Sequence, residues 1–294
     1  MLTGKSGPNH RMMADKNHRI TIRKASGETE PFEPSKLIQS LQRSGANEKT
    51  AREITGDVTK WLTEGVSTKK IYARAFRLLR RKNNLHAVRY KLKRSLYELG
   101  PTGFPFEHLL GEILKRKGYR VEVGKVVAGR CITHEMDVIA TGNNEQLLVE
   151  CKYTKDQGKH VSIQVPLYVR ARIDDIVMKR KEMEEYHGYS FSGWIVTNTR
   201  FTSDSVEYAR CSGLHLLGWD YPAGKGLKEW MEKEKIFPLS ILNQLTRNQK
   251  DRLMEHGIVT CLQLHNNLHA LDEFGLSDKK LKAIRNEMEQ VLNY

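Results

Sequence analysis

Residues 134–154 read HEMDVIATGNNEQLLVECKYT, and this stretch decides the predicted fold. Two apolar runs of strand length flank TGNNE, which predicts a β-hairpin. If Asn143 and Asn144 form a two-residue turn, the numbers of facing residues add up to 287. Asp137 then lies opposite Glu150, so the hairpin carries an acid on each strand. A loop of another length would shift this register.

The second run, LLVECKYT at 147–154, contains two charged side chains that would be costly to bury without partners. Side chains alternate along a strand, so Glu150 and Lys152 share one face while Val149, Cys151 and Tyr153 face the core. Two interpretations of the charged pair remain open. It is either part of a functional site or a buried ion pair that stabilises the strand.

The functional interpretation is a metal site. Two carboxylates that lie close together repel each other unless a divalent cation sits between them. Oxygen ligands with open water positions suit Mg²⁺ or Mn²⁺ rather than zinc. Lys152 beside such a site could orient an attacking water or neutralise charge that develops on a phosphoryl group.

The composition is that of a globular protein with two or three domains, because the chain has 294 residues of which 39% are hydrophobic. No apolar run reaches the length of a membrane span, and the amino terminus lacks the apolar segment of a secretion signal. The four cysteines are far apart in the sequence, which favours reduced thiols over disulfides. We therefore expect a cytoplasmic protein with no membrane partner.

The positive charge is concentrated in the first third of the chain. The formal net charge is +14, and residues 1–104 hold 22 basic and 9 acidic residues, against 27 and 26 in the remainder. Eleven basic residues and no acid lie between Glu64 and Glu98. Such a block favours polyanions such as nucleoside triphosphates or a nucleic-acid backbone, and a solvated helix face is the alternative.

Turn and capping residues divide the chain into segments, which predicts a multidomain protein of mixed α+β and α/β class. We expect a polar tail over 1–18, and a β-hairpin followed by about four helices over 19–101. Residues 104–235 alternate strands and helices at the spacing of crossover units, which predicts a mixed sheet flanked by helices. Residues 236–294 form a small helical domain in this interpretation.

The central segment resembles a known enzyme class. From Phe104 to about Pro222, the stretches FEHLLGEILKRKGYRVEV, HEMDVIA, LLVECKY and SGWIVTNTRFTSDSVEYARCSGLHLLGWDYP resemble the PD-(D/E)XK nuclease superfamily in order and spacing. They are closest to its Mrr-like, type IV restriction branch. Such enzymes cut phosphodiester bonds with Mg²⁺, so the resemblance implies a restriction-endonuclease-like fold and DNA as the partner.

The same resemblance implies roles for particular residues. Asp137 and Glu150 would bind the metal together with the backbone carbonyl of Cys151, and Lys152 would be the catalytic lysine. Glu107 matches an acid on the first helix that can bind a second metal or its water. Alternatively, Glu107 is only a carboxylate in the first turn of a helix, where the helix dipole favours a negative charge.

The amino-terminal segment resembles the ATP-cone, a small nucleotide-binding regulatory domain of ribonucleotide reductases and of their repressors. The resemblance rests on ITIRKASGETEPFEPSKLIQSLQRSG and AVRYKLKRSLYELG and covers about residues 19–100. It implies that ATP or dATP binds as a regulatory ligand, with Arg23, Lys24 and Lys36 near the phosphates and Arg89 or Tyr90 near the nucleotide. The alternative is a degenerate cone that mediates oligomers or grips DNA with its basic helix.

The carboxy-terminal segment, 240–291, weakly resembles helix-hairpin-helix domains, and an ordinary helical packing or dimer module is the alternative. Together these observations favour a Mg²⁺-dependent DNA endonuclease that is regulated by an adenine nucleotide and acts in defence against foreign DNA. The alternative function is a nucleotide-sensing DNA-binding regulator in which the nuclease fold is a scaffold. Cutting both strands of DNA favours a homo-oligomer.

Overall fold

The computed structural model describes residues 20–24, 27–156 and 158–292. The predicted polar tail at 1–18 lies outside these residues, as do the side chains of Asn84, Leu85 and Arg89. The chain divides into two compact units, Met1–Ala87 and Val88–Tyr294, and each is described by itself. The division falls inside helix α4 (Asn84–Tyr97), whereas turn residues predicted a boundary after residue 101.

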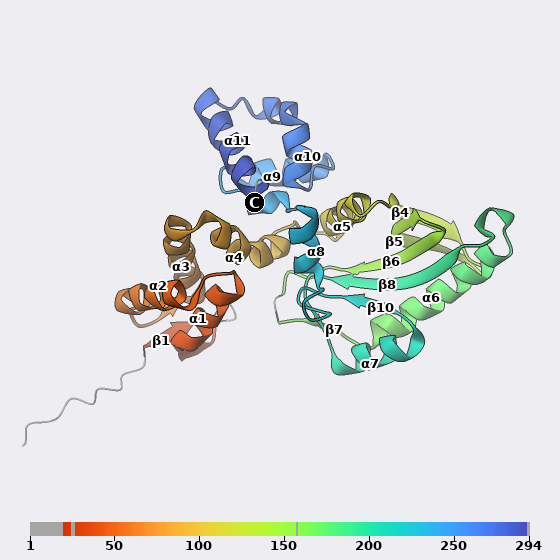
Figure 1. Cartoon of the computed structure of the whole chain (residues 1–294), viewed down its shortest axis with the longest axis horizontal. Coiled ribbons are helices and arrows are strands. Elements are labelled where there is room, and N and C mark those ends of the chain that lie inside the picture. The colour runs from red at the N-terminus through yellow and green to blue at the C-terminus, as the bar shows by residue number, and fades with distance from the viewer. Residues whose placement is uncertain (1–19, 25–26, 157, 293–294) are drawn as a thin grey trace, which may run out of the picture. The chain divides into compact units, whose positions relative to one another are not determined.

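The first unit is a small sheet with three helices (Figure 1). The predicted hairpin is present as β1 (Thr21–Arg23) and β2 (Thr29–Pro31), which pair antiparallel. A two-residue strand that was not predicted, β3 (Val66–Ser67), pairs with β1 in parallel. The helices are α1 (Pro34–Arg43), α2 (Glu48–Trp61) and α3 (Thr68–Lys82).

Local capping explains where these helices begin. The side chain of Asn47 accepts a hydrogen bond from the backbone of Thr50 at the start of α2, and Ser67 does the same for Lys70 at the start of α3. Both caps satisfy amide groups that the first turn leaves without helical partners. The apolar faces of α1, α2 and α3 supply the buried core of this unit, which includes Leu41, Val58 and Leu79.

The second unit contains a five-stranded mixed sheet in the order β10-β8-β6-β5-β4. Strands β4 (Arg120–Ala128), β5 (Thr133–Gly142) and β6 (Glu145–Lys152) are antiparallel. Strands β8 (Ser190–Thr197) and β10 (His215–Leu217) run parallel to β6, as the predicted crossover units require. The prediction of a mixed sheet flanked by helices is therefore confirmed.

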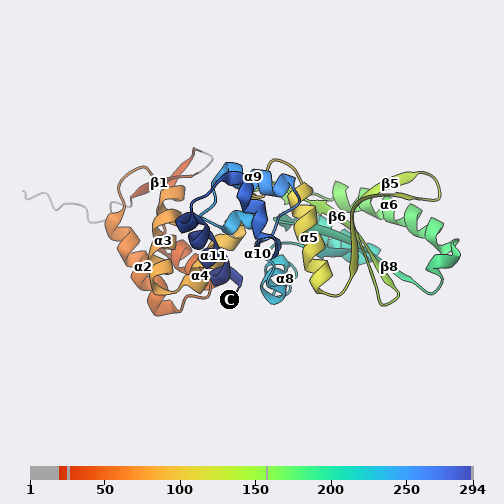
Figure 2. The same ribbon diagram turned by 90° about the horizontal axis from the view of Figure 1, so that it is seen from above.

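Helices cover both faces of this sheet, as Figures 1 and 2 show. Helix α5 (Phe104–Arg116) packs Leu110 and Ile113 against one face, in a core shared with Val149 of β6. Helix α6 (Gln164–Lys181) packs the other face with α7 (Ser203–Ser212), in a second core that includes Ile173 and Leu148. A two-stranded sheet of β7 (His160–Val161) and β9 (Arg200–Phe201) lies outside the main sheet.

The remaining elements are helical. They are η1 (Glu184–Tyr186), α8 (Leu227–Glu234), η2 (Leu239–Ile241), α9 (Arg247–Glu255), α10 (Cys261–Asn266), η3 (Leu268–Phe274) and α11 (Asp278–Leu292). Buried residues of α9 and α11, such as Leu253 and Ile284, belong to the same apolar core as α5. Within the described part of the chain, no helix is both long enough and apolar enough to cross a bilayer.

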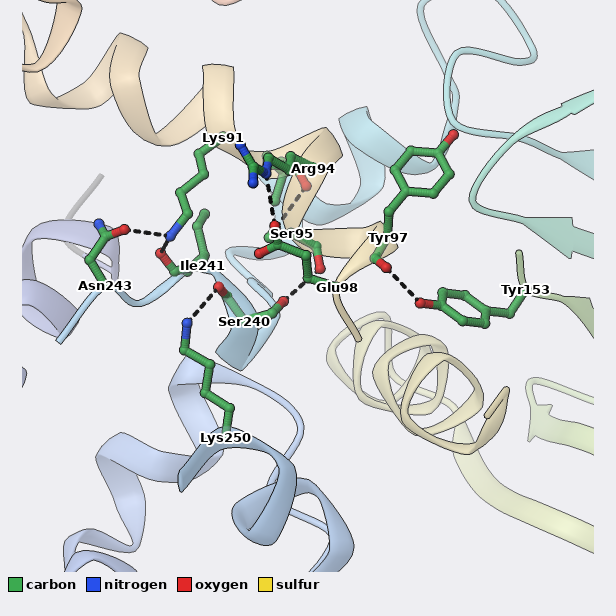
Figure 3. A network of polar contacts seen from close by, with 11 residues as sticks. Lys91, Arg94, Ser95, Tyr97, Glu98, Tyr153, Ser240, Ile241, Asn243 and Lys250 are labelled. Atoms are coloured by element: carbon green, nitrogen blue, oxygen red, sulfur yellow. Dashed lines mark hydrogen bonds and ion pairs between the residues drawn. The ribbon is translucent and has the colours of Figure 1, made fainter. Parts of the chain in front are cut away.

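A polar network joins α4 to the carboxy-terminal helices (Figure 3). Lys91 donates to the backbone oxygen of Ile241 and to Asn243 Oδ1, the latter at 2.8 Å. Ser240 Oγ donates to the Ser95 carbonyl at 2.6 Å, while Lys250 Nζ donates to the Ser240 carbonyl at 3.1 Å. Burial, with the charge of Lys250 as a smaller cause, lowers the pKa of Lys91 to about 8.

The five-stranded sheet is joined to α4 as well. Tyr153, the residue after β6, donates from its hydroxyl to the carbonyl of Tyr97 at 3.0 Å (Figure 3). The same hydroxyl lies 3.4 Å from the carbonyl of Gly100. The segment that follows Lys152 is therefore held from the end of α4.

Candidate active site

The hairpin of β5 and β6 has the predicted register. Paired residues run from Gly142 with Glu145 to Val138 with Val149, so their numbers add up to 287. Asn143 and Asn144 form the turn with φ angles of 51° and 55°, in the left-handed region that suits a two-residue hairpin.

Asp137 lies where the ladder between the two strands ends. It does not continue the ladder with Glu150; its Oδ2 instead accepts a hydrogen bond of 2.6 Å from the backbone amide of Cys151. Its other carboxylate oxygen has no hydrogen-bond partner among the described residues. That oxygen is available to a ligand.

Glu150 is a buried carboxylate, 3% exposed, with a cation on each oxygen. Lys152 Nζ lies 2.7 Å from Oε1, and Arg172 Nη1 of α6 lies 2.5 Å from Oε2. These contacts place Glu150 and Lys152 on the face covered by α6, whereas Val149 and Cys151 belong to the core under α5. The predicted division of the strand into two faces is therefore correct.

Burial and neighbouring acids raise two pKa values here. Burial, followed by the charge of Glu150, raises the pKa of Asp137 to about 6. Burial, followed by the charges of Asp137 and Glu135, raises the pKa of Glu107 to about 7. Glu107 of α5 therefore lies within electrostatic range of Asp137, and we call Asp137, Glu150 and Glu107 the acidic cluster. Its carboxyl has no hydrogen-bond partner in the described ranges.

Lys152 stays protonated beside these acids. Burial acts to lower its pKa, but the hydrogen bond and charge of Glu150 outweigh that effect, and the pKa is raised. Its side chain is 36% exposed, so the ammonium group is reachable from solvent. The ammonium lies 5.9 Å from the centre of the Tyr168 ring. A reacting phosphate could therefore meet a permanently charged donor at this position.

Sequence reasoning missed Arg172 and Tyr168. Arg172 donates to the Tyr168 hydroxyl at 2.5 Å and also to the backbone oxygen of Glu135. The available signal was the spacing of four residues between Gln164, Tyr168 and Arg172, which puts three polar groups on one side of a helix. Gln164 itself is exposed at the start of α6.

Residues at the end of β8 hold the chain directly after Lys152. Thr197 Oγ1 donates to the Lys152 carbonyl at 2.6 Å. The fully buried Asn198 accepts from the Thr154 amide at 3.0 Å and donates to the Thr154 carbonyl at 2.7 Å. The side chain thus replaces a backbone pairing beyond the strand end.

We expect Asn198→Ala to lower the kcat of the expected DNA cleavage by about tenfold or more, with little change in the KM for DNA. The reason is that the substitution releases the segment that positions Lys152. The loss of both hydrogen bonds is also expected to cost about 2 kcal/mol of stability. Ser205→Ala is the matched control, since Ser205 is equally buried and bonds the Val161 carbonyl in the same domain. An equal fall in kcat in both variants would show that the effect is only structural.

The acids fit a divalent cation, and Glu150 can take part because its contacts with Lys152 and Arg172 use only some of the lone pairs of its carboxylate. Asp137 and Glu107 each have a raised pKa and a carboxylate oxygen without a partner, which is the electrostatic state of a site that favours a cation. The described residues contain no group of three or more His, Cys, Asp or Glu side chains in metal-binding arrangement. Backbone oxygen, as predicted for Cys151, and water would therefore complete the coordination of Mg²⁺ or Mn²⁺.

The residues predicted to bind nucleotide lie in both units. In the first unit Lys24 Nζ lies 2.8 Å from Glu30, and Lys36 Nζ lies 3.9 Å from the same carboxylate and 3.0 Å from Glu33. Lys24 and Lys36 therefore gather around Glu30. Arg23 is exposed on β1, and Tyr90 is buried in the second unit.

The mixed sheet flanked by helices is consistent with a restriction-endonuclease-like core. Residues 101–231 match a family model described as restriction endonuclease, of the Mrr catalytic type. Residues 237–292 match a second model, described as AF1548-like, C-terminal.

A related sequence and a related crystal structure, both described without a function, each match this chain over nearly their whole length. An uncharacterised protein of Archaeoglobus fulgidus is 29% identical over 184 residues, covering 62% of this chain and 99% of its own. The crystal structure of the protein of unknown function AF1548 is similar with a TM-score of 0.53 and 28% identity, over 65% of this chain and 99% of that one.

A more distant similarity concerns Can2 from Sulfobacillus thermosulfidooxidans, solved in complex with cyclic tetra-adenylate. It has a TM-score of 0.31 and 15% identity, over 70% of this chain and 64% of that one. A similarity at this level carries no functional conclusion.

Proposed function

We propose that the protein is a divalent-cation-dependent endonuclease that hydrolyses phosphodiester bonds in DNA. The observation that carries this proposal is that Asp137 bonds the Cys151 amide next to Glu150, whose carboxylate lies 2.7 Å from Lys152. Glu107 lies within electrostatic range of Asp137 and Glu150. The match of residues 101–231 to a restriction endonuclease model supports the same class of reaction.

Each residue has a distinct role in this proposal. Asp137 and Glu150, with the Cys151 carbonyl, bind the cation. Arg172 holds one oxygen of Glu150 and orients that carboxylate. Lys152 donates to the phosphate oxygen on which negative charge develops, or orients the water that attacks. A bound Mg²⁺ or Mn²⁺ would supply Lewis acidity and lower the pKa of its water.

Glu107 provides a proton-transfer group near the reaction. A carboxyl with a pKa of about 7 exchanges protons readily at neutral pH, which suits a residue that accepts a proton from water or binds a second cation. A carboxylate present only because the helix dipole favours it would not need burial among other acids.

The test is cleavage of supercoiled plasmid, linear duplex and single-stranded DNA and RNA, with Mg²⁺, Mn²⁺ or a chelator. We expect nicking or linearisation of DNA that requires the cation. Binding of DNA without cleavage under every cation would instead favour the alternative function, a DNA-binding regulator built on a nuclease scaffold. Cutting of both strands would favour a homodimer, which sedimentation of the full chain measures.

We further propose that the first unit is an ATP-cone that binds ATP or dATP and regulates cleavage. The gathering of Lys24 and Lys36 around one carboxylate supports this, since two lysines that lie this close can instead hold phosphate oxygens. Regulation requires that the nucleotide bind one state of the protein better than another.

Calorimetry with ATP and dATP tests this regulatory site. We expect Lys36→Ala to weaken binding by about tenfold, and Glu30→Gln to strengthen it, because Glu30 competes with phosphate for both lysines. Arg52→Ala is the control, since Arg52 pairs with Glu48 elsewhere in the unit. If neither ATP nor dATP gives a heat of binding with the wild type, the proposal of a regulatory nucleotide site is contradicted.

A further inference from the structure

Helix α3 carries a straight row of cations. Lys70, Arg74, Arg77 and Arg81 follow one another at intervals of four, three and four residues, so they lie on one side of the helix. We call these four residues the α3 stripe. Their spread along the helix axis is about 16 Å, a length over which duplex DNA presents roughly ten phosphate charges. Lys69 and Arg80 lie exposed on an adjacent side of the same helix.

In the part of the chain that the structure describes, no carboxylate pairs with the cations of the α3 stripe. Lys70, Arg77 and Arg81 are exposed and have no ion pair within the described ranges. Arg74 lies 4.9 Å from the centre of the Trp61 ring, and its Nε is buried without a hydrogen-bond partner in the described structure. Nearby cations differ, because Arg52 pairs with Glu48 and Lys82 with Glu53. A structural role as surface ion pairs therefore does not explain the stripe.

We infer that the α3 stripe binds the phosphate backbone of nucleic acid, and this inference rests on the proposed DNA substrate. An extended polyanion fits the row better than a nucleoside triphosphate, because a triphosphate is too short to meet all four cations. A membrane surface fits poorly, since a surface helix needs an exposed apolar side. The apolar residues of α3, such as Ile71, Ala75 and Leu79, are already buried in the core of the first unit.

The test measures binding of the full chain to a labelled duplex of about 30 base pairs, in a chelator so that cleavage cannot occur. Arg77→Glu/Arg81→Glu is compared with Lys49→Glu/Arg52→Glu, which changes the net charge equally on α2 of the same unit. We expect the α3 variant to bind at least about tenfold more weakly and to reduce the salt dependence of log K by about 2. The α2 variant should stay within about twofold of the wild type.

Other results of the binding test would contradict the inference about the α3 stripe or the proposed nuclease activity. Equal weakening in both variants, or no weakening, would overturn the inference. The inference would also be overturned if the wild type bound vesicles of anionic lipid more tightly than it binds DNA, and the α3 variant lost this vesicle binding. Arg77→Gln/Arg81→Gln repeats the test if the charge reversal lowers Tm. If the α3 variant binds DNA more weakly but the wild type does not cleave DNA in Mg²⁺, the proposed nuclease activity is contradicted and the inference about α3 is supported. If the wild type cleaves DNA but the α3 variant binds DNA as tightly as the wild type does, the nuclease activity is supported and the inference about α3 is contradicted.

Discussion

Replacing Lys152 with alanine is expected to lower the rate of DNA cleavage by about 10³-fold. The reason is that its ammonium group is the exposed cation beside the two acids, and it remains charged because Glu150 raises its pKa. Cation and DNA affinity should persist, since Lys152 is not expected to bind the metal. Single-turnover cleavage measures the rate, and calorimetry with Mn²⁺ measures the binding.

Lys155→Ala is the matched control for this prediction. Lys155 is exposed three residues further along the chain and has no contact with the acids among the described residues. We expect it to cleave at nearly the wild-type rate. If Lys152→Ala cleaves DNA at a rate within about tenfold of the wild-type rate, Lys152 does not have the proposed catalytic role.

The acidic cluster is expected to make cation binding and stability depend on pH. The folded pKa values, about 6 for Asp137 and about 7 for Glu107, are above the ordinary values of these groups. Between the unfolded and folded pKa values the folded protein binds more protons than the unfolded chain. Without metal, the stability from these groups is therefore present at low pH and is lost as pH rises through about 6–7.

A divalent cation should offset that loss. We expect Mn²⁺ to raise Tm at about pH 7.5 by a few degrees and to have little effect at about pH 5.5, where protons occupy the same carboxyls. Glu107→Gln should raise the metal-free stability at about pH 7.5 by roughly 1 kcal/mol, since it removes a repelled charge that is partly screened by solvent. Scanning calorimetry at both pH values measures these changes.

The control for this second prediction is Glu112→Gln. Glu112 lies on the same helix but pairs with Lys115 at 2.7 Å, so its removal should not stabilise the metal-free protein. An equal effect of Mn²⁺ at both pH values would contradict the assignment of the raised pKa values to the cation site.

The hairpin and its charged face could be predicted from the sequence because both follow from local rules. A two-residue turn at Asn143 and Asn144 determines the register, and the alternation of side chains then determines which residues join Glu150. The helices of the first unit could be predicted for a similar reason, since Asn47 and Ser67 cap them directly.

Other features depend on tertiary packing and left no comparable signal. Strands β3, β7 and β9 have two residues each, too few to display a period. Arg172 reaches Glu150 only because α6 crosses that face of the sheet. The division of the chain inside α4 reflects the packing of its later residues with the carboxy-terminal helices, whereas Gly100 and Pro101 mark only a local break.

The central claim is that Asp137 and Glu150 share a divalent cation. The most direct measurement is the anomalous scattering of Mn²⁺ in crystals of the full chain. We predict a peak within about 2–2.5 Å of a carboxylate oxygen of each acid, and no peak there in Asp137→Asn. A Mn²⁺ peak that touches neither acid in the wild type, under conditions in which the protein cleaves DNA, would contradict the claim.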